Sequence, residues 1–119
     1  MANEEENSEI LGTRLVFFAD GLFALSATVS ARAEESQDED AKKACEYLAV
    51  TFNVIGAWVQ LLGDYLLFQV VQKELEDNLN SAEPFDEQAG RLEVLVAGSQ
   101  VALDILEVQL AERAAEIVR

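Results

Sequence analysis

The sequence predicts an all-α protein, an antiparallel up-down-up bundle of three long helices. Three observations predict this fold. The helix formers Ala, Leu, Glu and Gln dominate long apolar stretches, and no stretch shows the sustained alternation of a strand. The one proline, Pro84, lies at a junction between two stretches. The connections are short, which makes consecutive helices antiparallel neighbours. A length of 119 residues suits one domain, which we assign to residues 1–119.

The first helix is predicted over residues 8–32. The Ser8 hydroxyl can cap its first turn, and Glu9 follows at the positive end of the helix dipole. The acidic residues 34–40 then interrupt the apolar pattern, so the helix is expected to end before them.

The second helix is predicted over residues 38–79, starting at the last acids of that stretch. At about 1.5 Å per residue it would be about 60 Å long, which is long for a small domain. A kink or break near Asn53–Gly56 would divide it and give four helices. Both versions stay open at this point.

The third helix is predicted over residues 84–118. Pro84 fits a first helical turn, where its missing N–H group costs nothing. Asp86 and Glu87 complement the positive end of the dipole, and Arg113 lies towards the negative end.

The apolar helical pattern repeats and keeps an acid near the middle of each helix. A shift of 40 residues superimposes Gln60 and Asp64 on Gln100 and Asp104, and a shift of 44 superimposes Asp20 on Asp64. Repetition of this kind predicts an architecture of similar helices. A shared heptad-like pattern in bundle helices would produce several of these identities by itself.

Most of the circumference of the second helix is apolar between Tyr47 and Val71. A surface helix needs an apolar stripe only about 100° wide, so this helix is expected to be central or covered by another subunit. Three helices cannot easily hide so much apolar surface. We therefore expect a homo-oligomer, most simply a two-fold dimer, that completes the bundle. Trp58 is a candidate interface residue because tryptophan is frequent at interface hot spots.

Small residues recur at heptad spacing in the first two helices, which places them on one face of each helix. We interpret them as positions where two helix backbones approach closely. The alternative is a groove that carries an apolar ligand. The candidate packing residues are Gly12, Ala19, Ala49, Gly56 and Gly63.

The net charge of −15, from 23 acidic and 8 basic residues, argues against nucleic acid as a partner because phosphate backbones are repelled. The charge favours solubility and would also suit a basic protein partner. A salt-rich habitat is another source of such a composition.

Catalysis has few candidate groups in this sequence. The chain has no histidine, and its one cysteine, Cys45, has no imidazole to activate it. We therefore expect no enzyme activity, no cofactor and no metal. We interpret the mid-helix polar residues as solvated or locally hydrogen-bonded, and a cation site or an acid pair with a raised pKa is the alternative. These residues are Asp20, Gln60, Asp64, Gln100 and Asp104.

A membrane protein is the remaining alternative, because residues 47–63 carry no charge. Asp64 directly follows that stretch, and the flanks lack the Lys and Arg excess expected on a cytoplasmic side. The first six residues are acidic where a secretory signal needs positive charge. We therefore expect a cytoplasmic, self-associating bundle with a structural or interaction role.

Overall fold

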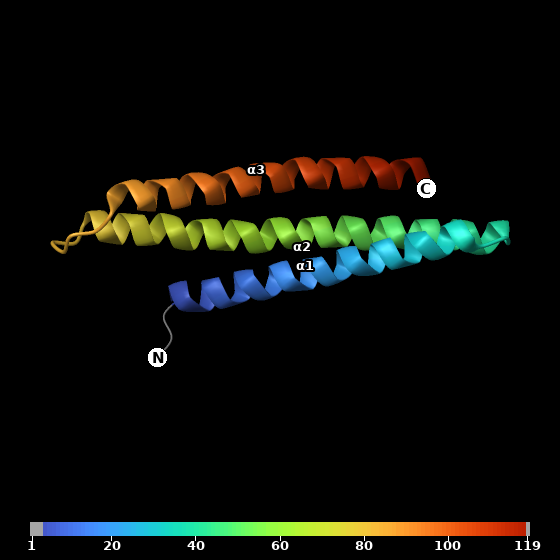
Figure 1. Ribbon diagram of the computed structural model, residues 1–119, viewed down its shortest axis with the longest axis horizontal. Coiled ribbons are helices and arrows are strands. Elements are labelled where there is room, and N and C mark those ends of the chain that lie inside the picture. The colour runs from blue at the N-terminus through green and yellow to red at the C-terminus, as the bar shows by residue number, and fades with distance from the viewer. Residues whose placement is uncertain (1–3, 119) are drawn as a thin grey trace.

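The computed structural model describes residues 4–118 and shows an all-α three-helix bundle. Helix α1 spans Glu4–Glu35, α2 spans Glu39–Leu79 and α3 spans Glu87–Val118. Consecutive helices run antiparallel, as predicted (Figure 1). The outermost parts of the predicted domain, residues 1–3 and 119, lie outside the described residues.

The three helices form a single layer rather than a triangular bundle. Helix α2 lies in the middle and packs against both neighbours, whereas within residues 4–118 no Cα atom of α1 lies within 8 Å of one of α3. The Phe23 side chain of α1 nevertheless packs against the buried cluster of Ala57, Val108 and Ala111. The molecule accordingly measures 67 × 29 × 18 Å. Figure 1 shows α1 and α3 on opposite sides of α2. Each outer helix therefore packs mainly against α2, and much of its surface stays uncovered.

Helix α1 begins at Glu4, four residues before the predicted start. The prediction that Ser8 caps the helix was wrong, because Ser8 lies inside it. Three consecutive acids, Glu4, Glu5 and Glu6, occupy the first turn, where the dipole favours negative charge. The helix also continues to Glu35, three residues beyond the predicted end.

Helix α2 is continuous over its 41 residues, including Asn53–Gly56. The alternative with a break there is therefore not what the structure adopts. Asp38 caps the helix: its Oδ1 accepts a hydrogen bond of 3.0 Å from the backbone N–H of Asp40. The sequence placed both ends of this helix within one residue.

Helix α3 begins at Glu87, three residues after the predicted start. Pro84 lies in the preceding turn and not in the first helical turn, which corrects the prediction. Asp86 decides the start, because its Oδ1 accepts a hydrogen bond of 3.0 Å from the backbone N–H of Ala89. The turn before it is organised by Ser81, whose Oγ accepts from the N–H of Glu83 at 3.1 Å.

The small residues form the α1–α2 interface. Gly12 and Gly63 lie directly opposite each other, and a methyl group placed on either would come within 2.9 Å of the carbonyl oxygen of the other. Gly56 contacts the ring of Phe23. Farther along, the Ser26 hydroxyl donates a 2.7 Å hydrogen bond to the carbonyl oxygen of Ala49, which is buried. Ala19 is also buried. Close backbone approach, rather than a ligand, fills these faces.

Candidate functional site

The layer has two broad sides, and α2 shows how they differ. Asn53, Gln60 and Asp64 recur at spacings of seven and four, which puts them on one side of the helix. Asp64 is close enough to Asp20 and Glu107 for their charges to affect it, so acids from all three helices gather on this side. We call this side the acidic face, and it consists of Asp20, Asn53, Gln60, Asp64, Gln100 and Glu107.

The opposite side of α1 and α2 is apolar. On α2 it is formed by residues three or four apart, and on α1 by residues seven apart that lie across the helix from Asp20. Each of these side chains is between 45 % and 59 % exposed. We call this the apolar face, and it consists of Leu11, Phe18, Leu25, Ile55, Trp58, Leu62 and Tyr65.

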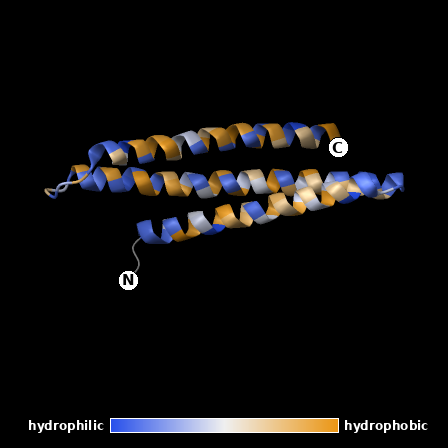
Figure 2. Ribbon diagram, viewed as in Figure 1, coloured by the Kyte–Doolittle hydropathy of each residue, from blue (hydrophilic) through white to orange (hydrophobic). Residues whose placement is uncertain are grey.

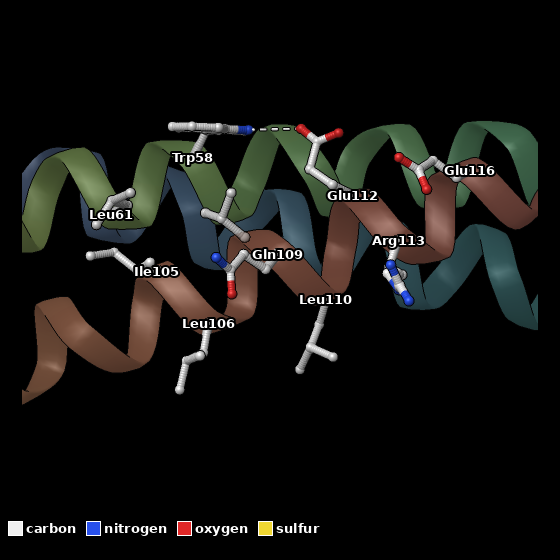
Figure 3. Close-up of a pocket in the computed structure, with 10 residues that line it drawn as sticks. Trp58, Leu61, Ile105, Leu106, Gln109, Leu110, Glu112, Arg113 and Glu116 are labelled. Carbon is white, nitrogen blue, oxygen red and sulfur yellow. Dashed lines mark hydrogen bonds between the residues drawn. The ribbon is translucent and has the colours of Figure 1, made fainter.

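Trp58 also borders an open groove of about 910 Å³ between α2 and α3. Its indole Nε1 donates a hydrogen bond of 3.0 Å to Glu112 Oε1 on α3 (Figure 3). Leu61 and Ile105 line the same groove. Trp58 is therefore a half-exposed bridge between two helices. Sequence reasoning did not find Glu112, because the pair is 54 residues apart and no local pattern connects them.

Helix α3 carries a second apolar surface that α2 leaves uncovered, and at one end Leu92 and Val96 also line a hollow beside Leu67 of α2. Figure 3 shows Leu106 and Leu110 pointing away from α2. They belong to a series with heptad-like spacing whose members are 52–82 % exposed. We call this series the outer stripe of α3, and it consists of Leu92, Val96, Leu103, Leu106, Leu110 and Ile117. Figure 2 shows hydrophilic residues concentrated around the loops, with hydrophobic and hydrophilic residues alternating along the helices.

The α2–α3 interface contains a pair of acids. Asp104 is completely buried, and its carboxyl lies beside that of Asp64, close enough for a hydrogen bond when one of the two carries a proton. Asp104 Oδ1 accepts a hydrogen bond of 2.9 Å from Gln100 Nε2, one turn earlier on α3. Asp104 Oδ2 is buried and receives no hydrogen bond from a nitrogen or hydroxyl donor of residues 4–118. A carboxyl proton is therefore the donor that this pair needs.

Desolvation raises the pKa of Asp64 to about 7, with further contributions from the hydrogen bond to Asp104 and from the negative charges of Asp104, Glu107 and Asp20. No lysine or arginine within residues 4–118 forms an ion pair with Asp64 or Asp104. A proton on one of the two carboxyls would relieve the repulsion between them.

The structure places the predicted polar residues in different environments. Asp64, Asp104 and Gln100 come together, and the local hydrogen bond predicted for Gln100 is present. Gln60 lies one turn from Asp64, and its Oε1 is buried without a hydrogen bond within the described chain. Asp20 is exposed. The solvated interpretation is therefore wrong for Asp104.

The acids do not form a cation site of the usual kind. Within residues 4–118 no three Asp, Glu, Cys or His side chains are gathered closely enough to hold a metal ion. A separate acidic hollow joins the start of α1 to the end of α2 and is lined in part by Glu5, Glu9 and Glu74. Desolvation and the charges of Glu5, Glu9 and Glu93 raise the pKa of Glu74. The hollow is a repulsive region that salt would screen.

Comparison of the chain with protein-family models, curated proteins and solved structures finds no match. The function must therefore be argued from the two faces and the acid pair. All three helices contain an 18-residue stretch that is apolar enough to cross a membrane by length and composition.

Proposed function

We propose that this protein acts by self-association, as a non-catalytic structural or interaction module in which a second copy covers the apolar face. The observation that carries the proposal is the separation of the two sides of the layer. Seven large apolar side chains of α1 and α2 lie half-exposed on one side, and the acids around Asp64 lie on the other, whereas Glu112 lies beside Trp58.

The charge distribution favours a second copy as the occupant. Two chains of net charge −15 repel each other at a distance. When the apolar faces meet, however, both acidic faces point outward and stay in water. The layer is 67 Å long and 29 Å wide, so this side offers more area than the about 800 Å² per partner of a typical stable interface. The outward acidic faces would also suit a basic protein partner.

The non-catalytic part of the proposal rests on the side chains. The chain contains no histidine, and Cys45 is half-buried in α2. Of the acid pair, Asp104 has no exposed surface on which a substrate could bind, and Asp64 is half-buried beside it. Structural use of these groups is the simpler interpretation.

A membrane-associated protein is the second candidate, favoured by the apolar stretch in each helix. The acidic face argues against it. Asp20 and Glu107 are exposed on α1 and α3 near the level of Asp64, and charged side chains facing lipid are costly. A single layer has no interior in which to hide them. We therefore propose a soluble protein in the cytoplasm.

Light scattering after size-exclusion chromatography, on protein expressed without detergent, tests the proposal. We expect a discrete dimer. A monomer at micromolar concentration would contradict self-association. Recovery of the protein only in the membrane fraction would contradict the soluble assignment and support the membrane candidate. Co-purification of an extractable apolar molecule on a monomer would favour a carrier, with the groove beside Trp58 as its site.

Two matched variants then locate the interface. Leu62→Glu places a charge in the apolar face and is expected to give a monomer. Leu110→Glu places the same charge in the outer stripe of α3, where the leucine is even more exposed, and is expected to leave the dimer intact. The reverse result would assign the interface to the outer stripe of α3 instead.

A further inference from the structure

Helix α3 is attached to the rest of the layer mainly through α2. Its buried residues are few and mostly small: Val108, Ala111, Ala115 and Asp104. A completely buried acid is therefore one of the main groups at this interface. The hydrogen-bonding needs of Asp104 bear directly on how firmly α3 packs.

The contacts of Asp104 are incomplete unless a proton is present. Gln100 donates to Oδ1 from the same helix, so that hydrogen bond does not join α3 to α2. The group that reaches across the interface is the carboxyl of Asp64. Two ionised carboxylates can accept hydrogen bonds but cannot donate them, and they repel each other. With one proton, the same two groups attract.

We propose that Asp64 and Asp104 together bind one proton and that this proton fastens α3 to α2. The inference does not depend on the proposed self-association, because both carboxyls belong to an interface within one chain. The apolar face lies mainly on α1 and α2, so a dimer could persist after α3 loosens.

The groups around the pair all raise the pKa of Asp64. Glu107 of α3 and Asp20 of α1 add negative charge near Asp64, and burial disfavours its ionised form. These effects hold the pKa of Asp64 at about 7, compared with 3.8 for an ordinary aspartate. The proton is therefore retained below neutral pH and is lost as the pH rises through about 7. Above that pH, two adjacent negative charges weaken the attachment of α3.

Trp58 provides a reporter for this attachment. It is the only tryptophan in the chain, and its indole is hydrogen-bonded to Glu112 of α3. Loosening of α3 would break this hydrogen bond and change the fluorescence of Trp58.

The experiment combines two titrations of the full chain between about pH 3 and pH 9 at constant ionic strength, in the presence of a chelator. Carbon-13 NMR follows the aspartate carboxyls, and fluorescence follows Trp58. We expect one transition near pH 7 in both signals. Asp64→Asn should abolish it, and Asp104→Asn should move its midpoint to lower pH, because an amide supplies an N–H donor that does not titrate and carries no charge. Glu116→Gln, an exposed acid on the same helix, should leave it unchanged.

Asp20→Asn should lower the midpoint without abolishing the transition, because it removes only one of the neighbouring charges. The proposal is overturned if both carboxyls titrate in the ordinary acidic range. It is also overturned if the fluorescence transition persists at the same pH in the two asparagine variants. A carboxyl that titrates near pH 7 with no response at Trp58 would overturn it as well, since the proton would then not hold α3.

Discussion

The backbones of Gly12 and Gly63 meet so closely that the carbonyl oxygen of each lies 2.9 Å from the place where the other would carry a side-chain carbon. The contact is reciprocal and joins α1 to α2. It explains why glycine occupies both positions although glycine weakens a helix. Close approach of the two backbones compensates for the loss of helix propensity.

Gly63→Ala should destabilise the protein by about 1–3 kcal/mol, because the new methyl group would meet a backbone oxygen as well as Val16 and Leu15. Thermal or denaturant unfolding followed by circular dichroism measures the change. Gly21→Ala is the matched control. Nothing lies within 4 Å of its added methyl group, so stability should rise by about 0.5–1 kcal/mol from helix propensity alone. Equal effects in the two variants would contradict the close approach.

Ser26→Ala should lower the free energy of unfolding by about 0.5–1.5 kcal/mol, because it removes the hydrogen bond from Ser26 to the carbonyl oxygen of Ala49 on α2. Thr28→Ala is the comparison, since the Thr28 hydroxyl donates to Ala24 within its own helix and is exposed. Urea titration of both variants distinguishes them. A larger loss for Thr28→Ala would show that the contact between helices is unimportant.

The stability of the wild-type protein relative to Asp64→Asn should depend on pH. The folded protein holds the shared proton up to about pH 7, whereas an unfolded aspartate releases it near 3.8. Since the folded state then binds more protons, the stabilisation is complete below pH 3.8 and is lost as the pH rises through about 7. After allowance for solvent screening at the half-buried Asp64, we expect a loss of about 1–3 kcal/mol. Denaturant unfolding at several pH values measures it. A constant difference between the two proteins would contradict the prediction.

Added sodium chloride should stabilise the protein at neutral pH, because it screens repulsion in the acidic hollow between α1 and α2. Glu74→Gln should raise stability by about 0.2–1 kcal/mol at low salt and reduce the salt effect, since Glu5, Glu9 and Glu93 repel the ionised Glu74. Melting temperatures at low and high salt provide the measurement. Glu116→Gln controls for the general loss of one negative charge.

Helix content and order were predictable because they depend on patterns local in the sequence. The start of α2 was placed correctly because Asp38 is a strong capping residue at a clear change of composition. Two other starts were misplaced for a physical reason. Helix α1 begins before Ser8 because the acids of Glu4–Glu6 stabilise an earlier first turn. Helix α3 begins after Pro84 because Asp86 caps its first turn.

The candidate site was only partly predictable. The close approach of Gly12 and Gly63 was predictable, because each belongs to a series of small residues spaced seven apart along its own helix. That spacing puts the small residues of each helix on one face. Asp20 and Asp104 both lie in the middle of an apolar stretch, yet one is exposed and the other is completely buried. The difference is set by the register of α3 against α2, which depends on contacts distant in the chain. The exposure of the apolar face follows from the single-layer arrangement, and composition does not reveal it.

The distance between the backbones of α1 and α3 also determines how the molecule comes apart. Two helical hairpins share α2, and α1 and α3 meet only through side chains such as Phe23. The hairpin of α1 and α2 is held by the close approach of the two backbones at Gly12 and Gly63. The hairpin of α2 and α3 is held by an interface with few buried residues, one of which is the ionisable Asp104. Unfolding therefore need not be all-or-none. Helix α3 should detach first, and a stable two-helix hairpin should remain behind.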